Sequence, residues 1–179
     1  MASGVKTNDD CVKAYERLKT EHTAKCCVFK LNKNYTEVEL ETEVSCGKHD
    51  DMFDAYDEFM TKMPKDQCRY GVFEYGGRKD TEGKMISKAI FVSWAPDSAA
   101  MKQKMVHASS LNALKIKLNL GDIIQAADPS DLSEDTICER LKIKLDKEHL
   151  QQQRLCHCKG GGEQVQQQQQ HSDDFNPNA

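Results

Sequence analysis

The stretch Lys88-Ala-Ile-Phe-Val-Ser-Trp94 decides the fold of this chain. Residues 89–92 are apolar without interruption, which predicts a strand buried on both faces in the interior of a sheet. Pro96 cannot donate to a sheet ladder, so we expect the strand to end there. Asp97 or Ser98 can then accept hydrogen bonds from the first amides of a following helix.

A long basic helix is predicted from this break to about residue 118. Its apolar residues form two stripes at helical spacing, and the second stripe is rotated by nearly a quarter-turn from the first. Met101, Met105 and Ala108 make the first stripe, and Leu111, Leu114 and Leu118 make the second. Since the hydroxyls of Ser109 and Ser110 can bond back to helix carbonyls, we expect a kink near them.

The rest of the chain predicts one α/β domain, a mixed five-stranded sheet between helices, with a tail. A helix follows Asp9, an Asp50-capped helix ends at Pro64, and a third helix starts at Ser133. The other predicted strands lie at 26–31, 35–44, 70–75 and 122–126. In the strand 35–44 we expect apolar residues on one face and solvated glutamates on the other. Gly76-Gly77 is expected to open a polar loop that runs through Gly83.

The predicted domain spans residues 1–145, and the Gln- and Gly-rich residues 146–179 are expected to be disordered, although a helix could continue through Leu150 and Leu155. With 29 acidic and 25 basic side chains, the chain has no strong overall attraction for nucleic acid or anionic membranes. It has neither an apolar run long enough for a membrane span nor a signal core, so we expect a cytosolic protein.

Eight cysteines raise the question of a metal site. There are no paired C-x-x-C knuckles, and the cluster Cys156-His157-Cys158 has no second ligand pair at zinc spacing. Reduced thiols, several of them packed in the core, are therefore favoured over zinc. The chain also has no P-loop and no G-x-S-x-G motif, so we expect neither an enzyme nor a cofactor. A cysteine-based redox protein stays open as an alternative.

A binding surface is predicted on the long helix. Lys102 and Lys104 flank the first apolar stripe, and Met105 and Val106 can supply apolar contact beside them. From the residues alone, an ordinary solvated helix face is favoured over a binding surface for these two lysines.

These residues also resemble a known family. The run Trp94-Ala95-Pro96-Asp97-Ser98-Ala99, followed by Lys102-x-Lys104-Met105-Val106 and Ala108-Ser109-Ser110, resembles the actin-depolymerising factor and cofilin family. The likeness covers about residues 1–145 and extends to Met1–Val5, Cys68–Tyr70, Gln125–Pro129 and Glu139-Arg140.

The resemblance implies a monomeric, non-enzymatic actin-binding protein of the cytoplasmic actin cytoskeleton. Such proteins bind monomeric and filamentous actin, prefer ADP-actin, and promote filament severing and depolymerisation. The residues that would bind both actin forms are Ser3, Gly4, Val5, Lys102, Lys104, Met105, Glu139 and Arg140. Ser3 matches a regulatory phosphorylation site, and Lys102, Lys104, Lys115 and Lys117 could bind a phosphoinositide headgroup.

A second, filament-specific surface is implied at Lys84, Lys88, Lys142 and Lys144. Here the chain departs from the family pattern, because Ile86 and Ile143 occupy positions expected to be basic. Arg78, Lys79 and Lys84 could compensate from the loop. The alternative within the family is therefore a homologue that binds actin monomers or the branched-filament nucleator and severs weakly.

Overall fold

The computed structural model describes residues 4–46 and 52–160. A single six-stranded sheet has the order β1-β3-β2-β4-β5-β6. The strands are β1 (Lys6–Thr7), β2 (Ala24–Leu31), β3 (Glu37–Ser45), β4 (Arg69–Lys79), β5 (Met85–Trp94) and β6 (Ile123–Ala126). The helices are α1 (Asp9–Glu16), α2 (Ala55–Thr61), α3 (Met101–Lys117), α4 (Glu134–Leu141) and α5 (Lys147–Gly160). Short helical turns extend α1 through Arg17–Glu21 and precede α2 at Met52–Asp54 and α4 at Pro129–Leu132.

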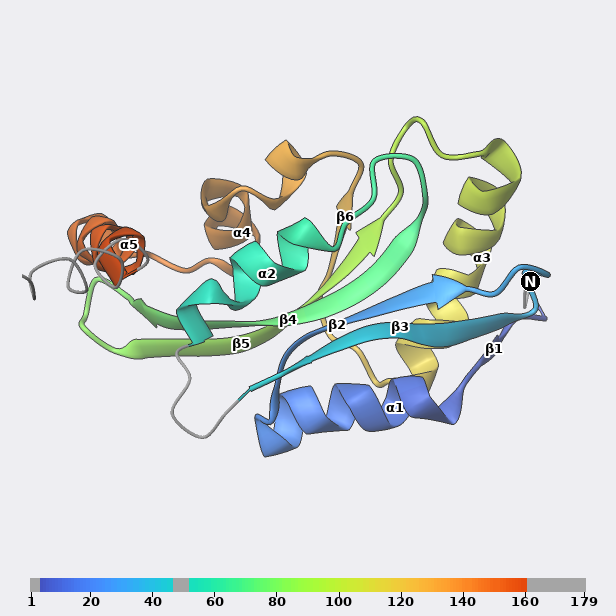
Figure 1. Cartoon of the computed structure of the whole chain (residues 1–179), viewed down its shortest axis with the longest axis horizontal. Helices are drawn as coiled ribbons and strands as arrows, with labels where there is room; N and C mark the ends of the chain where they lie inside the picture. The colour runs from blue at the N-terminus through green and yellow to red at the C-terminus, as the bar shows by residue number, and fades with distance from the viewer. Residues whose placement is uncertain (1–3, 47–51, 161–179) are drawn as a thin grey trace, which may run out of the picture.

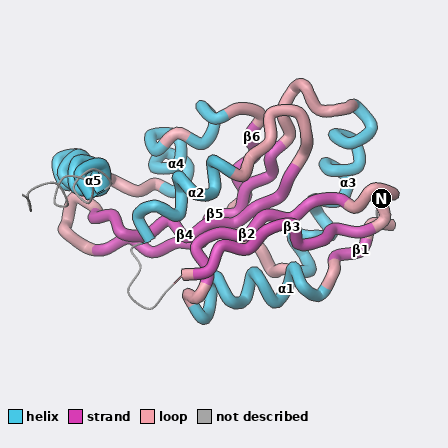
Figure 2. Tube along the Cα trace, viewed as in Figure 1, coloured by secondary structure: helices cyan, strands magenta, loops and turns pink. Residues whose placement is uncertain are grey.

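Helices cover both faces of the sheet, as Figures 1 and 2 show. Alternate residues of a strand point to opposite faces, so β2 contributes Cys27 and Phe29 to one core cluster and Cys26 and Val28 to the other. The first cluster is completed by α1 and α3, and the second by α2 and α4. The predicted α/β fold, with a mixed sheet between helices, is thus confirmed, and β1 adds a short sixth strand at one edge.

β5 is an interior strand next to the edge strand β6, and its two halves differ. Residues 90–94 are buried, as the apolar run predicts, whereas residues 85–89 are exposed or half-buried. β6 runs parallel to β5 from Phe91↔Ile123 to Trp94↔Ala126. The parallel pairing follows from the long crossover through α3, which brings the chain back beside β5 in the same direction.

The polar loop predicted at Gly76-Gly77 is wrong. Both glycines lie inside β4, which continues to Lys79 with a bulge between Tyr75 and Arg78. Arg78 is only 1% exposed, and its guanidinium lies 4.4 Å from the centroid of the Tyr75 ring. It cannot serve as the exposed loop cation that the sequence suggested.

The alternation predicted along β3 is also interrupted. Phe29 pairs with Leu40 and Val28 with Thr42, so Glu41 is an extra residue on β3. A bulge of this kind moves later side chains to the other face, which places Leu40 and Val44 in different core clusters.

The glutamates of β3 are not simply solvated. Glu41 accepts from Arg69 at 2.7 Å, and Glu43 accepts from Arg17 at 2.5 and 2.7 Å. Ion pairs with Arg69 and Arg17 therefore engage two of the β3 glutamates that the alternation predicts to be solvated.

The predicted cap of the long helix is wrong, whereas the cap at Ser133 is confirmed. α3 begins at Met101 after Ala100, which has no capping side chain, and Ser98 instead donates its hydroxyl to the carbonyl of Lys65. Ser133 accepts from the amide of Thr136 at 3.3 Å. The cap predicted at Asp50 lies outside the described residues.

Two further expectations concern α3 and the tail. Ser109 and Ser110 donate their hydroxyls to Val106 O at 3.0 and 2.6 Å, as predicted, within one continuous helix. The predicted tail begins with α5, so a helix does continue through Leu150 and Leu155, as the sequence allowed. Residues 161–179 lie outside the described residues. No helix in the described ranges is long and apolar enough to cross a membrane.

Candidate functional site

The N-terminal half of α3 presents an apolar surface to solvent. Met101 is 69% exposed and Met105 is 66% exposed, so the first predicted stripe faces outward. The opposite side of the helix buries His107, Ser110 and Leu114 against the sheet. Large exposed methionines are uncommon on a soluble surface without a partner, and they suit a contact patch that must adapt to another protein.

Two lysines flank these methionines, and neither is committed to a strong ion pair. Lys102 Nζ lies 5.5 Å from the centroid of the Tyr35 ring, and Lys104 Nζ lies 3.8 Å from Asp97 Oδ1. Exposed pairs of this kind contribute little stability, so both ammonium groups can be redirected to a partner at small cost. The helix itself is anchored between them, because Gln103 Oε1 accepts from the amide of Cys68 at 3.1 Å.

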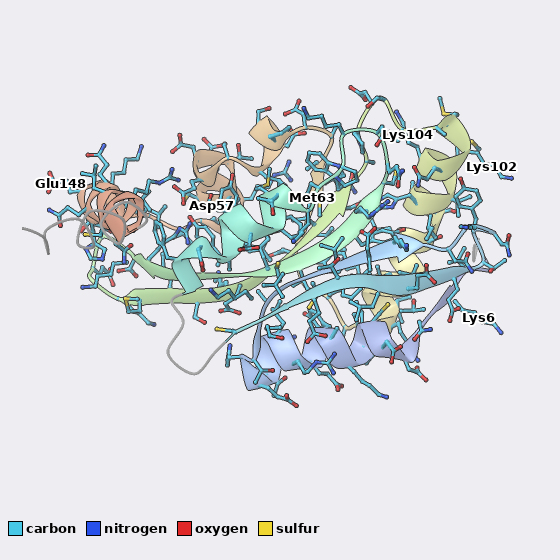
Figure 3. All side chains as sticks on the ribbon, viewed as in Figure 1. Lys6, Asp57, Met63, Lys102, Lys104 and Glu148 are labelled. Atoms are coloured by element: carbon cyan, nitrogen blue, oxygen red, sulfur yellow. The ribbon has the colours of Figure 1, made fainter. Side chains whose placement is uncertain are left out.

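The N-terminal segment lies at the same end of the molecule. Lys6 N donates to Thr36 O, and Asn8 N donates to Val38 O, each at 2.9 Å, which fixes β1 against β3. Val5 packs against the core cluster under α1 and α3, and Gly4 has φ +70°. Figure 3 shows Lys6 at the same end as Lys102 and Lys104. Ser3 lies outside the described residues.

Glu139 and Arg140 are exposed on the last turn of α4, which covers the opposite face of the sheet from α3. Arg140 lines a depression together with Lys88. The structure therefore brings Arg140 beside the filament-side lysines, and its shared role with Lys102 stays a prediction.

The four predicted filament-side lysines converge. A depression of 490 Å³ between the β4–β5 hairpin and the segment after α4 is lined by Lys84, Lys88, Lys142 and Lys144. Backbone contacts hold the two segments together, since Thr81 N donates to Lys144 O at 2.9 Å. Ile86 and Ile143 are half-buried and pack against the core cluster under α2 and α4. Their apolar character thus has a packing explanation.

Lys115 and Lys117 lie near the other end of α3. Lys117 Nζ is 3.9 Å from Asp9 Oδ1. The rise of an α-helix places Lys115 about 16 Å along the axis from Lys104, so the four predicted phosphoinositide lysines do not form one compact pocket.

A buried polar cluster under α3 was missed by sequence reasoning. His107 stacks on the Tyr70 ring, with centroids 3.9 Å apart, and its Nε2 lies 2.9 Å from Ser93 Oγ. Burial, with a smaller contribution from the positive charge of Arg69, lowers the pKa of His107 to about 4. The only sequence signal for this cluster is the position of His107 between the apolar residues Val106 and Ala108.

The buried thiols do not form a reactive site. Desolvation raises the pKa of Cys11 and of Cys26 to about 12 and also raises the pKa of Cys27. A thiol must ionise to act as a nucleophile or metal ligand, so these groups are inert near neutral pH. Within residues 4–46 and 52–160, no group of three or more candidate ligands could hold a metal ion.

Comparison with known proteins matches this chain to a protein family. Residues 4–142 match the family model described as "Cofilin/tropomyosin-type actin-binding protein". The chain is 37% identical to actophorin of Acanthamoeba castellanii over 141 residues, which cover 78% of this chain and 96% of the relative. It is 33% identical to cofilin of Mycosarcoma maydis over 142 residues, covering 79% and 96% of the two chains.

Solved structures agree with the fold described above. The crystal structure of Streptomyces griseoflavus cofilin superposes with a TM-score of 0.63 at 38% sequence identity, over 76% of this chain and 96% of that one. The solution structure of the ADF-like UNC-60A protein of Caenorhabditis elegans gives a TM-score of 0.62 at 26% identity, over 79% and 96%.

Proposed function

Because the chain belongs to the cofilin and actin-depolymerising factor family, we propose that it binds monomeric and filamentous actin and promotes filament severing and depolymerisation, with a preference for ADP-actin. The observation that carries this proposal is the exposed end of α3, where Met101 and Met105 lie beside Lys102 and Lys104. The family consists of actin-binding proteins rather than enzymes. The raised pKa values of the buried cysteines argue against the redox alternative.

In this proposal the two kinds of side chain on α3 have different roles. Burial of the methionines against actin supplies apolar contact area, at roughly 25 cal/mol per Å² before the costs of association. The lysines attract an acidic surface and fix the orientation of the complex. Gly4 and Val5, held beside α3 by β1, extend the same surface.

The depression lined by Lys84, Lys88, Lys142 and Lys144 is proposed as the filament-specific surface, and Arg140 lines the depression that adjoins it. Glu139 and Arg140 are proposed to bind both actin forms. Half-buried Ile86 and Ile143 reduce the charge available there, and this favours the second candidate, a monomer-binding homologue that severs weakly or binds the branched-filament nucleator. The two candidates differ in filament affinity, not in monomer affinity.

Regulation is proposed at the surface that binds monomers. A phosphate on Ser3 would bring nearly two negative charges to the N-terminal edge of this surface and weaken actin binding. A phosphoinositide-rich membrane would contact Lys102, Lys104, Lys115 and Lys117 as a spread basic face and compete with actin. The protein would act as a monomer in the cytoplasmic actin cytoskeleton.

Sedimentation with preformed actin filaments tests the proposal. We expect the protein in the pellet together with a dose-dependent rise of actin in the supernatant, since it both binds and depolymerises filaments. Absence from the pellet, with monomeric actin still bound, would favour the second candidate. Failure to bind actin in either form would overturn the proposal.

A further inference from the structure

The first half of β5 has an open edge. β6 pairs with β5 only along residues 91–94, and no other segment in the described ranges pairs with that side of residues 85–90. The open stretch is six residues, about 20 Å, long. An unpaired strand edge presents a row of free backbone donors and acceptors and can accept another strand.

The outward-facing backbone groups can be assigned. Ala95 N donates to Ala126 O, so Ala95 faces the β6 side of the strand. Backbone groups of successive residues point alternately to the two sides, and β5 carries no extra residue in this stretch. The N–H and C=O groups of Met85, Ser87 and Ala89 therefore face the open edge.

Two depressions run along this edge and join. One has a volume of 530 Å³ and the other 490 Å³, and both are lined by Ser87, Lys88 and Leu141. The larger one spans both faces of the sheet, with Lys19 on the α1 side and Arg140 on the α4 side. The result is a trough with the open strand edge along its floor.

The two walls of the trough differ in chemistry. On the α4 side, Lys88, Arg140 and Lys142 are all exposed. On the α1 side, Met85 is 53% exposed, and the carboxylate of Glu74 is already engaged, since Ser87 Oγ donates to it at 2.5 Å. The one lysine on this side, Lys19, has its Nζ 5.5 Å from the Tyr15 ring centroid. Acidic side chains of a ligand are favoured toward α4, and apolar side chains toward α1.

We infer that the open edge of β5 is a docking site for an extended acidic segment of a partner protein, which adds to the sheet as a strand along Met85–Ile90. Its side chains alternate, with carboxylates facing Lys88 and Arg140 and apolar groups facing Met85. A second copy of this chain is disfavoured as occupant, because it would bring Lys88 and its neighbours against like charges. The inference does not depend on actin binding.

The test uses the full chain, labelled for amide NMR, and a short capped peptide of alternating Glu and Val. We expect saturable shifts of the Ser87 and Ala89 amides, with affinity at least about tenfold above that of the same peptide with Lys in place of Glu. Ser87→Pro removes an outward N–H without removing a bond to β4 and should abolish binding. Ser87→Ala loses the same hydroxyl bond to Glu74 but keeps the N–H, so it is the matched control and should still bind the peptide.

A charge variant keeps the test decisive if Ser87→Pro lowers the melting temperature. The double variant Lys88→Glu, Arg140→Glu should lose the Glu-Val peptide and gain the Lys-Val peptide. The inference is overturned if no amide in residues 85–90 shifts at about 1 mM peptide, if a folded Ser87→Pro binds normally, or if both peptides bind equally.

Discussion

Replacement of Arg78 by alanine should lower the stability of the fold without removing an actin contact. The Arg78 guanidinium lies 4.5 Å from the Phe53 ring centroid and 4.4 Å from that of Tyr75. Its Nε donates to Glu134 Oε1 at 2.9 Å, and its Nη1 donates to Gly76 O at 2.9 Å. Arg78→Ala leaves the Glu134 carboxylate and this carbonyl without their buried donor.

Breaking a buried ion pair by removing one partner costs about 3–5 kcal/mol. Glu134 keeps Arg154, whose Nη2 lies 2.8 Å from Oε2, so we expect the lower end, about 3 kcal/mol. In a chain of this size that loss lowers the melting temperature by roughly 6–12 °C.

Thermal unfolding followed by circular dichroism measures the effect. Lys84→Ala is the matched control, because Lys84 is an exposed cation of the same hairpin and its loss should leave the melting temperature unchanged. If Arg78→Ala melts as the unmodified protein does and instead binds filaments less well, Arg78 is an exposed binding residue and the packing account of this hairpin is wrong.

Three further predictions concern the proposed actin-binding surface and the buried side of α3. The double variant Lys102→Ala, Lys104→Ala should lose at least about tenfold in affinity for monomeric actin, measured by fluorescence titration, with stability changed by less than about 1 kcal/mol; unchanged affinity would place the site elsewhere. Ser3→Glu should weaken binding to monomers and filaments with an unchanged melting temperature, whereas Ser3→Ala should bind normally; equal affinities would exclude the N-terminus from the interface. Because burial lowers the pKa of His107 to about 4, the unfolded chain binds more protons than the folded one between about pH 6.5 and 4, and stability falls as pH falls through this range, by about 3 kcal/mol. Urea unfolding at pH 6.5 and pH 4 should show a smaller loss of stability for His107→Phe than for the unmodified protein. An identical loss would mean that the pKa of His107 is the same in the folded and unfolded states.

The sequence predicted the elements whose pattern is set by local chemistry. The apolar run in β5, the crossover to β6 and the cap at Ser133 all follow from side chains close to one another in the chain. It also predicted that Lys102 and Met105 would lie on the outer surface of a helix. Their proposed role in actin binding comes from the family resemblance, because an exposed lysine beside a methionine has no unique chemistry.

The failures arose where tertiary contacts override local preference. Gly76-Gly77 favours a loop, yet the buried Arg78 continues β4 because its charge finds Glu134, a partner 56 residues away. Ser98 favours a helix cap, yet it bonds Lys65 O. The bulge at Glu41 shifts the alternation of β3, and no residue of that strand signals it.

The convergence of the filament-side lysines could not be predicted from their spacing. The rest of β5 and the whole of α3, β6 and α4 lie between Lys88 and Lys142 in the chain. The contact that brings them together, between Thr81 and Lys144, is a backbone bond that carries no sequence signature.

The central claim, that the N-terminal half of α3 binds actin, is tested most directly by lysine acetylation of the full chain with and without monomeric actin, read by mass spectrometry. We predict that actin slows modification of Lys102 and Lys104 and leaves the rates at exposed Lys62 and Lys147 unchanged. Equal rates at Lys102 and Lys104 in the bound and free protein, once binding has been verified in the same sample, would contradict it.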